Sequence, residues 1–436
     1  MKKATLMDMK KTVKKSNDVM AQRLYAPYAK AEWGFINHWY PVKFSNEIAE
    51  GAVVGAQICG VPLVLRRSKG KVYALKDQCL HRGVKLSAKP MCLTEDTITC
   101  WYHGFTYSLE TGSLVSIVAA PDDEIIGTTG ISVYPVEEVN GMIFVFVTSD
   151  DFDDEIPPLS QDMPIRFPHN NERFPHPLWP DSPSVLDKNV VCLGIHRTGY
   201  ANWRLACENG FDAGHLLIHK DNAIVLAKDW AVPLGIKPVS DQATQLVEDE
   251  NGPKGFINMY FTEHYEPVLE NKLLNVRAAG TVPKYFRTSM FVPGVLMVEN
   301  WPEENVVQYE WYVAITDDTY EYWEVLVKHC ENDEERQAFE YRFKNFYEPM
   351  ALHGFNDCDL FARDAMQNFY ADGSGWNDEQ LGDMDYSIIT WRKIASRYNR
   401  GIAKTPRGVA GVVKGASNVL AEIRGDQPGA IRDKAE

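Results

Sequence analysis

Two short stretches, CLHRGVKLS at 79–87 and TCWYHGFTY at 99–107, decide the fold of the first part of this chain. Each brings one cysteine and one histidine close together, and the four residues are Cys79, His81, Cys100 and His103. Eighteen residues separate the first histidine from the second cysteine. Two thiolates and two imidazoles at these spacings predict a metal centre carried at the tips of two hairpins.

The order of the four donors favours a Rieske [2Fe–2S] cluster, in which two cysteines bind one iron and two histidines bind the other. The alternative is a structural zinc site, since zinc also accepts two cysteines and two histidines. Zinc fingers usually pair cysteine with cysteine and histidine with histidine, so the interleaved order argues against zinc. Imidazole ligation raises the potential of the cluster, which would therefore accept electrons from a low-potential donor.

A second cluster of possible ligands lies in NWRLACENGFDAGHLLIHKD, at 202–221, which we interpret as one helix. His215 and His219 are four residues apart, so a helix places them on one face, about 6 Å apart along its axis. Asp212, three residues before His215, shares that face. Two imidazoles and one carboxylate from elsewhere would form the facial triad of non-haem Fe(II) oxygenases, which leaves coordination positions open for O2.

The third ligand is expected in GFNDCDLFARDAM, at 354–366, where the candidates are Asp357, Asp359 and Asp364. Spacing alone does not separate Asp359 from Asp357. A histidine pair at this spacing is more often a packed or surface pair, and Asp212 could be an ordinary surface acid. Because the histidine pair follows a Rieske-type motif in the same chain, we favour its interpretation as part of an oxygen-activating iron site.

Five runs carry a resemblance to a known family: WGFINHWYPV, ALKDQCLHRGVKLS, TCWYHGFTY, ENGFD with the histidines after it, and GFND with the aspartate after it. They resemble the oxygenase components of Rieske non-haem iron ring-hydroxylating oxygenases, over about residues 25–415. The resemblance implies one Rieske [2Fe–2S] cluster and one mononuclear Fe(II) per chain, with O2 as co-substrate. It assigns the cluster to Cys79, His81, Cys100 and His103, and the mononuclear iron to His215, His219 and Asp359. It makes Asp212 the bridge through which electrons pass between subunits.

The resemblance also implies an α+β fold, with an all-β Rieske domain followed by a helix-grip catalytic domain around an antiparallel sheet. We expect the Rieske domain at 25–155, a proline-rich linker at 156–183, the catalytic domain at 184–400 and a tail at 401–436.

The local patterns predict five strand or helix arrangements. Hairpins are expected over 60–77 and over 136–147, where Asn-Gly favours a tight turn. The run 97–103 should pair with the strand that follows Glu110–Gly112. The pattern of residues 288–300 predicts one continuous strand. Asn332 and Glu335 predict a helix start, followed by four core aromatics: Phe339, Phe343, Phe346 and Tyr347.

The family resemblance implies a head-to-tail homotrimer, in which His103 of one subunit faces Asp212 of the next. An NADH-dependent flavin and iron–sulfur reductase, or a ferredoxin, would supply electrons. The expected substrate is a flat N-heteroaromatic ring, with 2-oxo-1,2-dihydroquinoline hydroxylated at C8 favoured. The Gly210 carbonyl would accept the ring N–H, although Gly210 could instead serve only a helix irregularity. A carbazole-type angular or cis-dihydroxylating dioxygenase is one alternative, and a Rieske electron carrier without a second iron is another.

Composition bounds the remaining possibilities. The chain has 436 residues, 45% of them hydrophobic, which suits two globular domains. The net charge of −15 argues against a nucleic-acid partner. The lysine-rich start lacks an apolar stretch, no run is long enough to span a membrane, and the eight cysteines show no disulfide framework. A cytoplasmic protein is therefore expected.

Positive charge is concentrated between Gly60 and Cys92. This segment holds one acid, Asp77, and eight basic residues: Arg66, Arg67, Lys69, Lys71, Lys76, Arg82, Lys85 and Lys89. A solvated hairpin surface is the slightly favoured explanation. The functional alternative is a docking patch that attracts an acidic electron donor.

Overall fold

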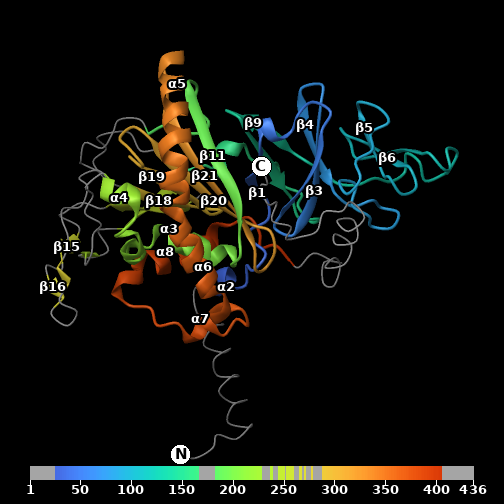
Figure 1. Ribbon diagram of the computed structural model, residues 1–436. Coiled ribbons are helices and arrows are strands. Elements are labelled where there is room, and N and C mark those ends of the chain that lie inside the picture. Colours follow the sequence, from blue (N-terminus) through green and yellow to red (C-terminus); the bar gives the residue numbers. More distant parts are fainter. Residues whose placement is uncertain are drawn as a thin grey trace, which may run out of the picture. The chain divides into compact units, whose positions relative to one another are not determined.

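The computed structural model (Figure 1) describes residues 25–165, 182–227, 236–238, 244–250, 252–259, 265–267, 270–271, 276–277 and 287–404. The described residues from Tyr25 to Ala403 belong to one compact unit. Residues 166–181 of the expected linker and all but the first four residues of the expected tail lie outside the described residues.

The first part of the chain consists of three small antiparallel sheets, with strand orders β1-β10-β9, β2-β3-β4-β8 and β5-β6-β7. Their bounds are β1 His38–Phe44, β2 Val53–Ile58, β3 Val61–Ser68, β4 Lys71–Lys76, β5 Thr97–Thr99, β6 Phe105–Ser108, β7 Leu114–Ile117, β8 Val133–Tyr134, β9 Val136–Val139 and β10 Met142–Val147.

Both predicted hairpins are confirmed. Strands β3 and β4 pair across Lys69 and Gly70, whose φ angles are 54° and 75°. Strands β9 and β10 pair across Asn140 and Gly141, with φ of 46° and 82°. Two consecutive residues with positive φ match the right-handed twist of the flanking strands, which is why Asn-Gly is favoured there.

The predicted pairing of 97–103 with the strand after Glu110–Gly112 is wrong. Strand β5 ends at Thr99, and β6 lies between it and β7 in the sheet. The chain reverses at Cys100–Gly104, where the Gly104 amide donates to the Cys100 carbonyl at 2.9 Å. The candidate ligands therefore occupy a turn rather than a strand.

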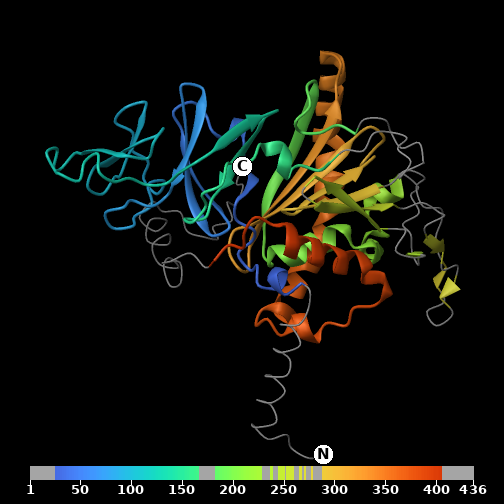
Figure 2. The ribbon, with the colours of Figure 1, turned by 180° about the vertical axis from the view of Figure 1, so that it is seen from behind.

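The second part of the chain is built on a seven-stranded antiparallel sheet of order β11-β21-β20-β19-β18-β14-β13, seen from opposite sides in Figure 1 and Figure 2. Its strands are β11 Val190–Gly199, β13 Thr244–Asp249, β14 Gly252–Met259, β18 Arg287–Phe291, β19 Val295–Glu299, β20 Val307–Ala314 and β21 Tyr320–His329. Two further pairs are formed by β12 Ile236–Pro238 with β15 Tyr265–Pro267 and by β16 Glu270–Asn271 with β17 Val276–Arg277.

The region 288–300, predicted as one strand, is two strands. Pro293 and Gly294 lie in the turn between β18 and β19, which pair with each other. Proline cannot donate to a ladder, and Gly294 adopts φ of 134°, so the chain reverses at this point.

Helices cover one face of this sheet. The α-helices are α2 Ala26–Ala29, α3 Trp203–Phe211, α4 Ala223–Ala227, α5 Asp333–Arg342, α6 Asn356–Tyr370, α7 Gly375–Asp378 and α8 Tyr386–Tyr398. The 3-10 helices are η1 Ser45–Glu47, η2 Leu159–Asp162, η3 Ala213–His219 and η6 Asp383–Asp385, and η5 Phe343–His353 is a π-helix.

The two faces of the sheet have different neighbours. On one face, Cys207 Sγ of α3 lies 3.8 Å from Met290 Sδ of β18. On the other face, the Trp311 ring of β20 lies 6.0 Å from the Phe144 ring of β10. The sheet is thus packed between helices and the first part of the chain.

Helix α5 begins as predicted, since the Asn332 side chain accepts from the Glu335 amide at 2.9 Å. Figure 1 shows this helix lying beside β11 and β21. Phe339, Phe343 and Tyr347 are buried, but Phe346 is 48% exposed. The prediction for Phe346 is wrong because α5 gives way at residue 343 to a π-helix, which changes the face that each residue presents.

Candidate metal centres

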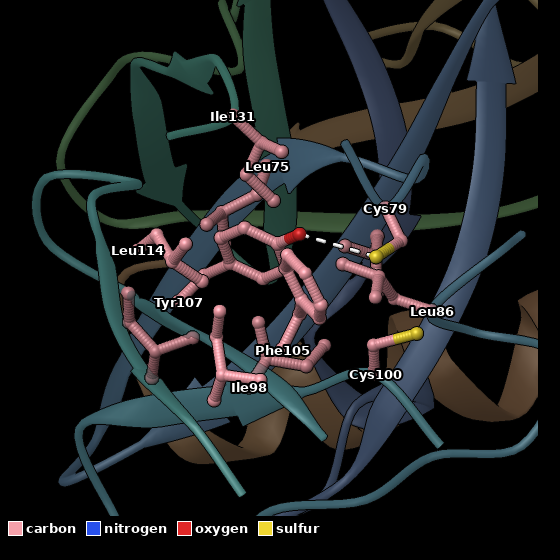
Figure 3. Close-up of a cluster of buried hydrophobic side chains, with 12 residues drawn as sticks. Leu75, Cys79, Leu86, Ile98, Cys100, Phe105, Tyr107, Leu114 and Ile131 are labelled. Atoms are coloured by element: carbon pink, nitrogen blue, oxygen red, sulfur yellow. Dashed lines mark hydrogen bonds between the residues drawn. The ribbon is translucent and has the colours of Figure 1, made fainter. Parts of the chain in front are cut away.

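Cys79 and Cys100 lie at one end of a buried hydrophobic cluster (Figure 3), and each is 1% exposed. Figure 3 shows the Tyr107 hydroxyl directed at the Cys79 sulfur, with an O–S distance of 3.1 Å. The same hydroxyl accepts a hydrogen bond from the Leu80 amide at 3.2 Å. Tyr107 was not singled out from the sequence.

The two histidines of this region face each other. Nδ1 of His81 and Nδ1 of His103 are 3.0 Å apart, and the His81 ring stacks on Phe105 with centroids 4.8 Å apart. His81 is exposed and His103 is half-buried. The imidazole edge therefore lies toward solvent, whereas the thiols point into the protein.

Each ligand pair sits in a tight turn that a glycine closes. The Gly83 amide donates to the Cys79 carbonyl at 2.8 Å, and the Gly104 amide makes the matching bond to Cys100. Both glycines have positive φ, 74° and 76°. A Cβ on Gly104 would overlap Val118, so this position excludes a side chain on steric as well as conformational grounds.

The donor atoms of the four residues do not converge on one point. Within the described residues, the one group of three or more donors that lie within 4.8 Å of one another is elsewhere. A single zinc ion would need all four donors about 2.0–2.3 Å from its centre. Cysteines on one side and histidines on the other fit a two-iron cluster better.

The segment 202–221, predicted as one helix, is broken at Asp212. Helix α3 ends at Phe211, Asp212 is extended, with φ of −68° and ψ of 116°, and η3 begins at Ala213. The Asp212 carboxylate accepts from the Gly214 amide at 2.8 Å. An aspartate that bonds the backbone two residues on caps a new helix and competes with continuation of the old one.

His215, His219 and Asp359 nevertheless come together. The Nε2 atoms of His215 and His219 lie 3.5 Å and 3.4 Å from Oδ1 of Asp359. His219 and Asp359 are 0% and 4% exposed, and neither His219 Nε2 nor Asp359 Oδ1 has a hydrogen-bond partner. Buried donor atoms that face one another without a hydrogen bond fit a bound cation.

Asp357, the alternative candidate ligand, forms an ion pair outside the site. Asp357 is 59% exposed at its side chain and pairs with Arg197. Two residues along α6 turn a side chain by about 200°, so Asp359 points inward where Asp357 points outward. Burial therefore separates two residues that spacing along the chain did not separate, and it agrees with the assignment of Asp359 that the resemblance implies.

Arg363, one helical turn after Asp359, was not predicted and organises the buried side of the site. Its Nε donates to Asn209 Oδ1 at 2.6 Å, and its guanidinium lies 4.5 Å from the centroid of the Tyr322 ring. Burial would raise the pKa of Asp359, but the neighbouring His219, His215 and Arg363 outweigh it and lower that pKa to about 2.

Gly210 has a packing reason to lack a side chain, since a Cβ there would overlap the Tyr312 hydroxyl, which bonds Glu310. The amide four residues on, that of Gly214, donates to Asp212 instead of continuing the helix. The Gly210 carbonyl thus loses the partner that an unbroken helix would give it.

Comparison with known proteins places these two centres in a family. A family model described as homotrimeric ring hydroxylase matches residues 151–403, and one described as the Rieske [2Fe-2S] domain matches residues 38–135. The chain belongs to the homotrimeric ring hydroxylases. It is a Rieske non-haem iron aromatic oxygenase, and its first part carries the Rieske domain.

Individual relatives cover nearly the whole chain. The terminal oxygenase component of carbazole 1,9a-dioxygenase from Metapseudomonas resinovorans is 42% identical over 87% of this chain and 94% of its own length. The solved structure of a 2-oxoquinoline 8-monooxygenase component is 63% identical, with a TM-score of 0.87 over 93% of this chain and 96% of its own. A carbazole 1,9a-dioxygenase terminal oxygenase from Novosphingobium sp. KA1 is 40% identical, with a TM-score of 0.78 over 87% and 97%.

No helix among the described residues is long and apolar enough to cross a membrane.

Proposed function

We propose that this oxygenase hydroxylates 2-oxo-1,2-dihydroquinoline at C8. The observation that carries the proposal is the 63% identity to a 2-oxoquinoline 8-monooxygenase component across 93% of the chain. The reaction inserts one oxygen atom of O2 into a C–H bond and reduces the other atom to water. It therefore consumes two electrons and two protons that reach the site from outside the substrate.

The residues of the two centres fit this chemistry. Cys79, Cys100, His81 and His103 would hold the Rieske cluster, while His215, His219 and Asp359 would hold a mononuclear Fe(II). When bound, the cluster supplies single electrons, and the mononuclear iron supplies open coordination positions for O2. We place the Rieske domain at 25–155, the linker at 156–183 and the catalytic domain at 184–400.

Asp212 is proposed to link the two kinds of centre between subunits of a head-to-tail trimer. His215 Nδ1 bonds the Asp212 backbone carbonyl rather than its carboxylate. The carboxylate Oδ1 caps η3, and Oδ2 is left to accept from the partner's His103. A heterologous contact of this kind closes into a ring, and a closed ring of three subunits agrees with a family described as homotrimeric.

Replacement of Asp212 by Asn should sharply lower turnover while both metal centres stay loaded, because the amide presents a donor where the partner's imidazole needs an acceptor. The measurement is coupled product formation per iron, together with the Rieske optical spectrum. Wild-type coupled turnover in Asp212→Asn would refute the bridge.

The substrate is proposed to bind where α3 ends and the metal-binding segment begins. The Gly210 carbonyl, which the helix break leaves without its usual amide, could accept the ring N–H of the lactam. N-methylation of the substrate removes this donor, so the methylated ring should bind more weakly. Equal binding of both rings would reject the contact.

The electron donor is proposed to be a ferredoxin, or an NADH-dependent reductase with its own iron–sulfur centre, that docks at the exposed histidine edge of the Rieske domain. Related carbazole 1,9a-dioxygenase oxygenases form complexes with ferredoxin. Of the eight basic residues between Gly60 and Cys92, Arg66 is buried, and three pair with acids of the same part of the chain: Arg67, Lys69 and Lys71.

The proposed docking patch therefore includes fewer basic residues than the eight that lie between Gly60 and Cys92. Arg82 and Lys85 are exposed beside His81, so charge reversal there should change the salt dependence of reduction. The same reversal at Arg67, which is held by Glu138 at 2.7 Å, is the matched control.

Product analysis under 18O2, with a surrogate reductase and NADH, tests the proposed reaction. One labelled oxygen in a C8-hydroxylated product is expected. Two labelled oxygens would instead identify a dioxygenase of the carbazole type, which is the second candidate function. The 42% identity to the Metapseudomonas resinovorans relative supports that candidate.

The third candidate, a Rieske electron carrier, does not account for the family match over 151–403 or for the converging His215, His219 and Asp359. Iron and sulfide quantification addresses it directly. Three irons and two acid-labile sulfides per chain are expected, whereas a carrier would hold two of each.

A further inference from the structure

Asn222 follows η3 by three residues and contacts both segments that supply donors to the candidate mononuclear site. Its Oδ1 lies 2.8 Å from Nδ1 of His219. Its Nδ2 donates to the Gly354 carbonyl at 2.9 Å and lies 3.5 Å from Cys358 Sγ. Gly354 immediately precedes the turn into α6, the helix that carries Asp359.

These contacts fix which end of the amide faces the histidine. A backbone carbonyl can only accept, so the nitrogen of the Asn222 amide must be the atom that faces Gly354. The oxygen then faces His219, and it too can only accept. Nδ1 of His219 must therefore carry the proton and donate it to Asn222.

The consequence lies at the other ring nitrogen. A neutral imidazole with its proton on Nδ1 has a lone pair on Nε2, and Nε2 is the atom that lies 3.4 Å from Asp359 Oδ1. Phe355 stacks on the His219 ring with centroids 3.6 Å apart and planes 7° apart, which fixes the plane of the ring. Asn222 fixes its tautomer and its rotation within that plane.

We propose that Asn222 is a positioning residue of the mononuclear metal site, which sets the His219 tautomer and holds η3 in register with the start of α6. The proposal rests on the metal site assigned under the proposed function. Outer hydrogen bonds to ligating histidines typically change metal affinity by 10- to 100-fold when removed. Through one amide, Asn222 contacts both segments that carry the candidate ligands.

The test measures the Fe(II) dissociation constant of the mononuclear site in the full-length protein, by competition with a chromophoric chelator under anaerobic conditions. Asn222→Leu keeps the approximate volume but removes both polar contacts, and it should weaken Fe(II) binding by about 10- to 100-fold. Asn222→Asp keeps the acceptor for His219 Nδ1 and loses the donor to Gly354, so it should recover most of the affinity.

Cys358→Ala is the matched control, since it removes the sulfur beside Asn222 and leaves both amide hydrogen bonds in place. Its Fe(II) affinity should equal that of the wild type. The Rieske optical spectrum, which reports on the other part of the chain, should be unchanged in all three variants, and far-UV circular dichroism with the thermal midpoint checks that the whole chain has folded.

Two results separate failure of this inference from failure of the assigned metal site. If His219→Ala binds Fe(II) as tightly as the wild type does, the site itself is wrongly assigned. If His219→Ala loses Fe(II) but Asn222→Leu keeps wild-type affinity, or Asn222→Asp binds as weakly as Asn222→Leu, the tautomer argument is overturned.

Discussion

The ion pairs of His196 should make the stability of this protein fall between about pH 6.5 and pH 9. His196 lies on β11, with Nδ1 at 2.5 Å from Glu321 Oε1 and Nε2 at 2.9 Å from Glu47 Oε1. Both ring nitrogens face carboxylates, so both must donate, and the ring is an imidazolium. Glu47 belongs to the first part of the chain, so the imidazolium ties η1 to the catalytic sheet.

The directions of the pKa shifts give the sign of the effect. Burial would lower the pKa of His196, but its hydrogen bonds to Glu321 and Glu47 outweigh burial and raise that pKa to about 9. Because the pKa of His196 is higher in the folded than in the unfolded protein, protonation of His196 stabilises the folded state. This stabilisation is complete below pH 6.5, the pKa of the unfolded state, and is lost as the pH rises through 9. The pKa of Glu47 is lowered to about 2, so the pair also weakens in acid below about pH 4.5.

The size of the stability change follows from the difference between the two pKa values of His196, about 6.5 unfolded and about 9 folded. At about 1.4 kcal/mol per pH unit the full window corresponds to roughly 3 kcal/mol, and screening at the partly exposed Glu47 reduces this to about 2 kcal/mol. With an unfolding entropy of about 2.1 cal/mol/K per residue, 436 residues convert this energy into a midpoint shift of about 2 °C.

The assay is the midpoint of thermal unfolding for the wild type and His196→Gln at pH 6 and pH 9.5. The variant should unfold about 2 °C lower at pH 6 and at nearly the wild-type midpoint at pH 9.5. Glu47→Gln should behave similarly, whereas Lys43→Met, which keeps both carboxylates, should retain the pH-dependent window. A difference between the wild type and His196→Gln that is the same at both pH values would refute the reasoning.

Three further predictions concern the two centres. His219→Ala should lose the mononuclear iron and keep the Rieske optical spectrum, as metal analysis and absorbance would show; retention of three irons would contradict it. Tyr107→Phe removes the hydroxyl beside Cys79 Sγ and should lower the cluster potential by on the order of 50 mV in a redox titration; an unchanged potential would argue against a hydrogen bond to the cluster. Gly210→Ala should destabilise the protein by about 2–4 kcal/mol through overlap with Tyr312 and loss of its bond to Glu310, and Tyr312→Phe in the same chain should recover part of this, whereas additive losses would exclude the overlap.

The sequence predicted what depends on local chemistry. The Cys-x-His and Cys-x-x-His pairs marked the first centre, and Asn140-Gly141 marked a tight hairpin, because each pattern has few other uses. The resemblance to the ring-hydroxylating oxygenases carried the fold class and the family, which the comparisons support.

What the sequence did not predict depends on contacts between distant segments. Spacing did not separate Asp357 from Asp359; the resemblance favoured Asp359, and the burial of one α6 face gives the physical reason. Tyr107, Arg363 and Asn222 each contact a segment far away in the sequence, at Cys79, Asn209 and Gly354 respectively, and spacing along the chain does not reveal these contacts. The break at Asp212 was missed because the apolar pattern of a helix continues across it, while a single carboxylate contact with Gly214 redirects the chain.

That break changes the directions from which the two imidazoles approach. In an α-helix, residues four apart differ by about 40° around the axis, whereas in a 3-10 helix they differ by about 120°. The planes of the His215 and His219 rings lie at 89° to each other, with centroids 5.2 Å apart. A chain whose α3 ran on unbroken to residue 219 would turn His219, relative to His215, by about 80° around the axis from its present position, so the two rings would meet Asp359 from other directions than they do here.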